Sequence, residues 1–291
     1  MIMEIEARTL LSAVKQADPW FGLKYNLNLY RGCQHQCIYC DSRSECYRIE
    51  NFNDILVKAN AIDLLRRELP RKRVKGTIGF GSMNDPYMPI EAERQLTRQA
   101  LEVVAACQFP VHIITKSDLV LRDLELLKQI GQIYAAVSLT ITTADDDLAK
   151  KVEPGAPSPS RRFSAMRQLA DAGILTGVTL MPVLPFIEDN PENIQSILSR
   201  AADSGAGYIL ASFGVTLRDR QRDWYYRHLE RFFPGLRQRY EETYGERYGC
   251  AVPNAARLES LTSRFCSRAG IPRHMPFYAP PPQAVVQPGL F

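Results

Sequence analysis

The sequence lacks the long apolar run that a membrane-spanning helix needs. Its longest candidate, residues 173–187, is interrupted by Gly, Thr and Pro and is shorter than a membrane span. The chain does not begin with a basic segment followed by an apolar one, so no secretory leader is predicted. These absences predict a cytoplasmic protein with no membrane partner.

The sequence also lacks a strong excess of charge. The net charge is only +4 over 291 residues, so the overall field does not demand a polyanionic partner. The basic run at 66–75 is the local exception. We interpret it as a solvated loop and as only a minor indication of a nucleic-acid partner.

The cysteines do not follow the pattern of a disulfide framework. They are odd in number, seven in all, and four of them lie between Cys33 and Cys46. In a chain without a leader, such clustering favours metal ligation over disulfide pairing.

Six apolar, β-branched segments are each followed by a segment with helical periodicity. Repeated units of this kind predict an α/β fold with parallel strands, either as a partial barrel or as a doubly wound sheet. In both arrangements, ligands gather at the C-terminal ends of the strands. The predicted strands are 25–30, 76–81, 110–115, 134–142, 174–185 and 208–214, and the predicted helices are 54–69, 91–107, 118–131, 160–173, 191–205 and 218–233.

Cys33, Cys37 and Cys40 form a C-x3-C-x2-C motif on the loop after the first predicted strand. Thiolates bind zinc, copper(I) or iron-sulfur clusters. A zinc site would need a fourth ligand, from Cys46 or His35, because the chain has no second C-x2-C pair. An electron-transfer ferredoxin would supply four cysteines and a proline. Three cysteines would instead leave one iron of a 4Fe-4S cluster open to a small molecule.

The segment "CQHQCIYC" resembles the radical SAM signature, C-x3-C-x-aromatic-C, with Tyr39 as the aromatic residue. The resemblance implies a partial (β/α)6 barrel and a 4Fe-4S cluster on the three cysteines. It also implies that the amino and carboxylate groups of S-adenosylmethionine (SAM) bind the fourth iron. An electron from an external donor of the flavodoxin or ferredoxin type would then cleave SAM to methionine and a 5'-deoxyadenosyl radical, which abstracts hydrogen from an unknown substrate.

Four further positions are candidates for contacts with SAM. Gly81 would let the methionyl group approach the backbone, and Asp85 is an acid at hand for its ammonium group. By the same resemblance, Lys116 would pair with the SAM carboxylate. Ser138 lies in a buried strand, where its hydroxyl group requires a partner, either the cofactor or neighbouring backbone.

Within the superfamily, four segments resemble the branch related to spore photoproduct lyase, over about residues 20–214. The predicted division is an N-terminal extension (1–19), a radical SAM core (20–214), a helical C-terminal extension (215–271) and a proline-rich tail (272–291). The segments are "YRGCQHQCIYCD", "GSMNDPYMPIE", "TKSDLVLRD" and "VEPGAPSPSRRFSAMRQLADAGI".

The resemblance raises DNA photoproduct repair as an alternative function. The lyase returns a hydrogen atom from a cysteine, and Ser82 occupies the position that corresponds to it. A serine O–H bond is too strong for that role, so a different substrate is favoured. A zinc or iron-sulfur binding module without enzymatic activity is the alternative from another class.

Several weaker candidates stay open. Cys46 could be a ligand, a hydrogen donor or a packed thiol, and an auxiliary cluster on Cys250 and Cys266 has no support from their spacing. From its position, Glu153 could bind a ribose. Arg162, like its neighbour Arg161, could reach an anionic group.

Overall fold

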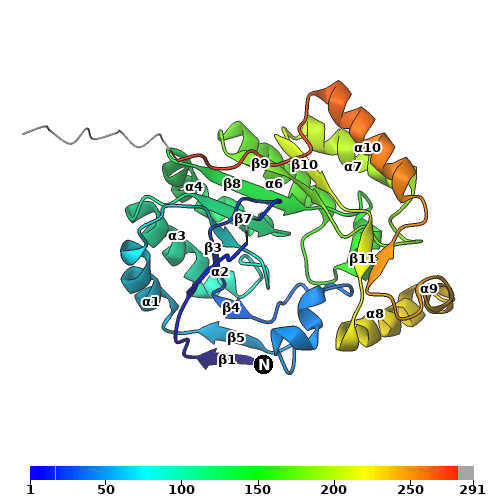
Figure 1. Ribbon diagram of the computed structural model, residues 1–291, viewed down its shortest axis with the longest axis horizontal. Coiled ribbons are helices and arrows are strands. Elements are labelled where there is room, and N and C mark those ends of the chain that lie inside the picture. The colour runs from blue at the N-terminus through cyan, green and yellow to red at the C-terminus, as the bar shows by residue number, and fades with distance from the viewer. Residues whose placement is uncertain (17, 281–291) are drawn as a thin grey trace, which may run out of the picture.

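The computed structural model describes residues 1–16 and 18–280 (Figure 1). Its main sheet has the order β10-β9-β8-β7-β6-β3-β2, and the neighbours from β3 to β10 are all parallel. At one edge, β2 runs antiparallel to β3. The strands are β2 (Leu11–Ala13), β3 (Tyr25–Leu27), β6 (Ile78–Phe80), β7 (Val111–Thr115), β8 (Ala135–Thr140), β9 (Leu175–Leu180) and β10 (Tyr208–Ala211).

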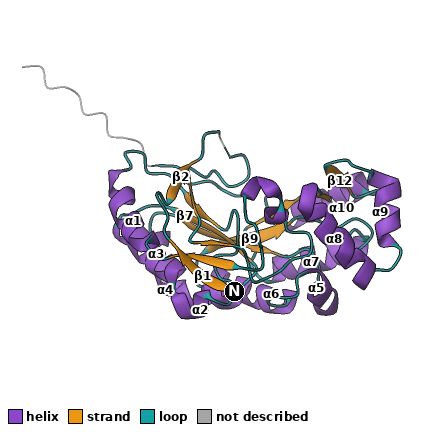
Figure 2. Cartoon of the chain, turned by 90° about the horizontal axis from the view of Figure 1, so that it is seen from below, coloured by secondary structure: helices purple, strands orange, loops and turns teal. Residues whose placement is uncertain are grey.

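Helices connect successive parallel strands and surround the central sheet, as Figure 2 shows. This is the predicted partial (β/α)6 barrel, and the C-terminal extension is mainly helical. No helix in the described part of the chain is long and apolar enough to cross a membrane. The helices are α1 (Ala61–Glu68), α2 (Glu91–Arg94), α3 (Leu96–Ala106), α4 (Leu124–Gly131), α5 (Asp146–Val152), α6 (Pro159–Asp171), α7 (Pro191–Asp203), α8 (Asp219–Phe232), α9 (Leu236–Tyr244) and α10 (Ala255–Ala269).

The central strands are buried on both faces, as expected for a parallel sheet covered by helices. All six residues of β8 are buried. Val137 and Leu139 belong to the large core beneath the helices, whereas Ala136 packs with Tyr208 and Met275 in a separate cluster. Alternation along the strand therefore sends one set of side chains outward and the other into the barrel.

Two small sheets flank the barrel. One has the order β1-β5-β4, formed by β1 (Ile2–Ile5), β5 (Ile55–Lys58) and β4 (Tyr30–Arg31). The other is an antiparallel pair, β11 (Gly214–Thr216) and β12 (Gly249–Ala251).

The prediction of one helix over 54–69 was wrong in its first part. The segment begins with β5, in which Ile55 and Val57 are buried, and turns helical only at Ala61. Its strand partners are β1 and β4, so tertiary pairing overrides the helical periodicity of the segment.

Other predicted elements are interrupted. The predicted strand 25–30 splits between β3 and β4, which belong to different sheets. The predicted helix 91–107 breaks at Gln95, whose φ is +52°. The predicted helix 118–131 begins as a 3-10 helix at Asp118–Asp123.

Both terminal segments pack on the barrel. Within the predicted N-terminal extension, β1 pairs with β5 and β2 pairs with β3. In the predicted tail, residues 272–280 have no helix or strand but pass along β10, where Ile209 N–H donates to the Pro272 carbonyl oxygen at 3.0 Å. Residues 281–291, which the same prediction covers, lie outside the described residues.

Met275 anchors this tail in the barrel. Its side chain is 1% exposed, whereas that of its neighbour His274 is exposed. We expect Met275→Ala to lower the free energy of unfolding by about 2 kcal/mol, since it removes buried apolar atoms and leaves a cavity. Urea denaturation measures this change, with His274→Ala as a neutral control. Equal stability of the two variants would contradict the anchoring role.

Candidate active site

One cavity lies where the loops after β3, β6 and β7 meet the barrel interior. Parallel strands bring their C-terminal ends to one edge, so residues distant in the sequence gather there. The cavity is lined by Cys33, His35, Cys37, Tyr39, Cys40, Asp41, Ser42, Gly81, Ser82, Met83, Asn84, Asp85, Ile114, Thr115, Lys116, Thr140, Pro182, Val215 and Thr216.

The three motif cysteines line this cavity together, and none is in a disulfide. Burial raises the pKa of Cys33 to about 12, and it also raises the pKa values of Cys37 and Cys40. A buried thiolate needs a compensating positive charge, which a bound metal supplies as the thiol loses its proton. The donor set therefore fits a thiolate-ligated metal group.

Within residues 1–16 and 18–280, no three His, Cys, Asp or Glu side chains converge on a point suited to one metal ion. In an iron-sulfur cluster, each thiolate binds a different iron, so more widely spaced sulfur atoms are suitable.

The cysteine loop is held by backbone contacts from later parts of the chain. Ile38 N–H donates to the Val152 carbonyl oxygen at 2.9 Å, and Gly155 N–H donates to that of His35 at 2.9 Å. A Cβ atom on Gly155 would lie only 2.2 Å from the Gln34 carbonyl oxygen. Glycine is therefore needed for this close approach.

Helix α8 covers the same loop from outside. Gln221 donates its amide N–H to the Tyr39 carbonyl oxygen at 3.0 Å. The Arg43 guanidinium lies 4.5 Å from the ring centroid of Phe52 and 3.6 Å from that of Trp224. The arginines and aromatics of this region thus pack against each other and fix the loop.

Gly81 and Asp85 shape the opposite wall. Gly81 has φ +101°, and a Cβ there would lie 2.3 Å from the Ile114 carbonyl oxygen. Asp85 accepts hydrogen bonds from the Thr115 hydroxyl at 2.6 Å and from Lys116 N–H at 2.7 Å. Although burial alone would raise it, contacts with His35 and Thr115 hold the pKa of Asp85 below its usual range.

Lys116 projects into the cavity beside a buried ionic network. Its Nζ atom lies 3.9 Å from Glu153, which also binds Arg162 at 2.6 Å and the Tyr39 hydroxyl. Although burial disfavours the charge, the neighbouring Cys37 and Glu153 raise the pKa of Lys116. The ammonium group therefore stays charged and faces the thiols.

Glu153 and Arg162 satisfy each other instead of facing solvent. Both are almost fully buried, and Arg162 also donates to the Thr140 carbonyl oxygen at 2.8 Å. Glu153 is almost fully buried and does not line the cavity, so the ribose contact suggested above stays a prediction. Arg161 is exposed and pairs with Asp118.

Ser138 lies inside the barrel but does not line the cavity. Its hydroxyl is 2.8 Å from His112 Nε2 and 2.6 Å from the Tyr208 hydroxyl. Thr140, two residues further along the strand, is the one that reaches the cavity. A contact between Ser138 and the cofactor stays a prediction.

The other cysteines, Cys46, Cys107, Cys250 and Cys266, do not line this cavity. Cys46 is exposed, 3.5 Å from the Ser44 hydroxyl. Cys250 and Cys266 are buried in two different hydrophobic clusters. Cys250 and Cys266 therefore pack as apolar side chains.

The family model described as the Radical SAM superfamily matches residues 27–199. The chain belongs to the radical SAM superfamily. It is 32% identical over 270 residues to an uncharacterized protein of Mycobacterium tuberculosis, covering 90% of this chain and 78% of that protein. It is 27% identical over 199 residues to the radical SAM Nα-GlyT isomerase of Pseudomonas phage M6, covering 68% and 41%.

The same fold occurs in spore photoproduct lyase. A structure of that enzyme complexed with dinucleoside spore photoproduct matches with a TM-score of 0.67 at 18% identity, covering 93% of this chain and 81% of the other. The protein is therefore a radical SAM enzyme with this fold. Membership implies that it uses SAM, an iron-sulfur cluster and a reductant, and it sets aside the alternative of a binding module without activity.

Glu188 is a buried acid behind the ionic network. It accepts hydrogen bonds from the Thr142 hydroxyl and from Leu184 N–H, and burial raises its pKa to about 8. The unfolded chain ionises near 4.5, below the folded pKa, so the unfolded state binds fewer protons between these values. Stability from this group is therefore lost as the pH rises through this window.

In the wild type, we expect the free energy of unfolding to fall by a few kcal/mol as the pH rises from about 5 to about 8. Glu188→Gln should remove this fall, because the amide does not ionise. Urea denaturation at several pH values measures it. The exposed Glu192→Gln serves as control and should leave the pH dependence of stability unchanged. An unchanged slope in Glu188→Gln would show that Glu188 ionises normally in the folded state.

Proposed function

We propose that Cys33, Cys37 and Cys40 hold one 4Fe-4S cluster whose fourth iron binds SAM. The observation that carries the proposal is the meeting of these three cysteines with Lys116 in one cavity. When bound, the cluster supplies the electron that cleaves SAM to methionine and a 5'-deoxyadenosyl radical. The protein's own part is to orient SAM and to exclude water from the radical.

Lys116 binds the SAM carboxylate in this proposal. Its support is the charged Nζ atom in the cavity wall, where 18% of the side chain is exposed. Glu153 lies 3.9 Å away and is already paired more closely with Arg162, so Lys116 keeps capacity for a second anion. Gly81 and Tyr39 line the same space and limit its shape.

The substrate that would lose a hydrogen atom to the radical is not a DNA photoproduct in this proposal. Repair of that photoproduct needs a cysteine that returns the hydrogen atom. Ser82 lines the cavity, and its hydroxyl donates to Asn28 at 3.2 Å. Of the described residues that line the cavity, the cysteines are Cys33, Cys37 and Cys40, which the cluster would occupy. We further propose a cytoplasmic location and an external donor of the flavodoxin or ferredoxin type.

Anaerobic reconstitution with iron and sulfide, followed by dithionite and SAM, tests the activity. We expect 5'-deoxyadenosine from the wild type and essentially none from Cys37→Ala, because the loss of one ligand disrupts the cluster. Liquid chromatography quantifies the product. Cys46→Ala is the matched control and should retain the yield.

No 5'-deoxyadenosine from the reconstituted wild type, or an undiminished yield from Cys37→Ala, would refute the proposal. An oligonucleotide that contains the thymine dimer of the spore photoproduct should remain unrepaired when it is added to the reaction. Repair would contradict the inference from Ser82.

Lys116→Ala should weaken SAM binding by about tenfold while sparing the cluster, because it removes one charge-assisted hydrogen bond. Calorimetric titration of the reconstituted protein measures the SAM affinity, and iron and sulfide analysis measures cluster content. Lys150→Ala, an exposed lysine on α5, is the control. Equal SAM affinities of Lys116→Ala and Lys150→Ala would exclude the carboxylate contact.

A further inference from the structure

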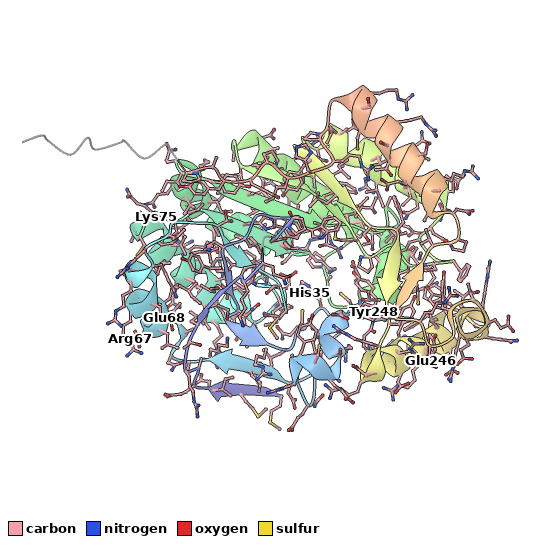
Figure 3. All side chains as sticks on the ribbon, in the orientation of Figure 1. His35, Arg67, Glu68, Lys75, Glu246 and Tyr248 are labelled. Carbon is pink, nitrogen blue, oxygen red and sulfur yellow. The ribbon has the colours of Figure 1, made fainter. Side chains whose placement is uncertain are left out.

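His35 is a buried histidine inside the cysteine motif, between Cys33 and Cys37. Its side chain is 2% exposed and lines the cavity. Figure 3 labels it near the centre of the molecule. Its carbonyl oxygen accepts the Gly155 N–H, so the backbone that carries the ring is fixed.

Asp85, which also lines the cavity, contacts the imidazole ring. His35 Nδ1 lies 3.2 Å from Asp85 Oδ2. The carboxylate cannot easily move, because it also accepts hydrogen bonds from Thr115, from Lys116 N–H and from Tyr87 N–H. A carboxylate at Nδ1 favours the tautomer with its proton on Nδ1, which leaves the lone pair on Nε2.

His35 Nε2 is then a buried acceptor without a partner. Among the described residues, neither ring nitrogen is in a well-aligned hydrogen bond, but Nδ1 has the Asp85 carboxylate 3.2 Å away, whereas Nε2 has no such contact. An unpaired buried polar atom is costly, so a partner from the cavity is expected. The methionine part of SAM carries an α-amino group, a strong N–H donor, next to the carboxylate proposed for Lys116.

Asp85 was expected to receive this amino group directly. Its oxygens already accept hydrogen bonds from Tyr87 N–H, the Thr115 hydroxyl and Lys116 N–H, and His35 Nδ1 lies 3.2 Å from one of them. His35 is the neighbouring group that keeps an acceptor for the ligand. The acid therefore acts through the imidazole.

We infer that His35, oriented by Asp85, accepts a hydrogen bond from the amino group of SAM. The inference rests on the proposed function, because it requires SAM in this cavity. It makes His35 a SAM-binding residue and Asp85 a positioning residue. Neither role follows from the cysteine spacing that defines the motif.

Two substitutions at His35 separate the two ring nitrogens. His35→Asn keeps a polar atom near the place of Nδ1 and loses the acceptor at Nε2. His35→Gln extends an amide to the place of Nε2. With reconstituted protein, we expect about tenfold weaker SAM binding by calorimetry for His35→Asn, and a smaller loss for His35→Gln.

The probe 5'-methylthioadenosine provides the control, because it keeps the adenosine but lacks the α-amino and carboxylate groups of the methionine part of SAM. Its affinity should be the same for wild type and His35→Asn. Equal SAM affinities of these two proteins, or a parallel loss of 5'-methylthioadenosine binding, would overturn the inference. If the wild type binds no SAM, the proposed function itself fails.

A measurement on the cluster-free protein is independent of cluster loading. The chain has four histidines, and comparison with His35→Asn assigns the ring signals of His35. Nitrogen-15 NMR should find its proton on Nδ1, and Asp85→Asn should weaken this preference. A proton on Nε2 in the wild type would overturn the inference, even if His35→Asn failed to take up iron.

Discussion

The burial of three cysteine sulfur atoms beside two carboxylates is the constraint on which the site depends. Burial raises the pKa values of all three thiols, and Asp85 and Glu153 add to this for Cys33 and Cys37 respectively. These groups become ligands only when positive charge replaces their protons. A loop with this property must be held from outside, and contacts from Val152, Gly155 and helix α8 hold it.

The charged groups around the cavity divide into two layers. Asp85 and Glu153 are engaged by protein partners, and Arg162 is buried behind Glu153. Lys116 and His35 remain to face the ligand space, one as a cation and the other as an acceptor. A zwitterionic amino acid group has a carboxylate for the cation and an N–H donor for the acceptor. Asp85 and Glu153 thus position His35 and Lys116, and the protein partners of the two acids compensate their negative charges.

Much of this arrangement could be predicted from the sequence, because it depends on local spacing and on the order of elements. The spacing of Cys33, Cys37 and Cys40 is a local pattern, and the alternation of strands and helices places their loop at the functional edge. Lys116 directly follows an apolar strand, so its position could also be predicted. These inferences need no knowledge of how deep a side chain lies.

The features that escaped prediction depend on contacts between distant segments. The strand β5 was mistaken for helix because its partners, β1 and β4, lie elsewhere in the chain. The contacts of the Ser138 hydroxyl with His112 of β7 and Tyr208 of β10 exist only in the folded sheet. The pairing of His35 with Asp85, and of Arg162 with Glu153, likewise requires the folded barrel.

The central claim is that the cluster offers one iron to SAM. Electron paramagnetic resonance of the reduced, reconstituted protein tests it most directly. Addition of SAM labelled with nitrogen-15 at its amino group should shift the cluster signal and introduce a coupling between cluster and nitrogen. A spectrum indifferent to SAM, with no such coupling, would contradict the account.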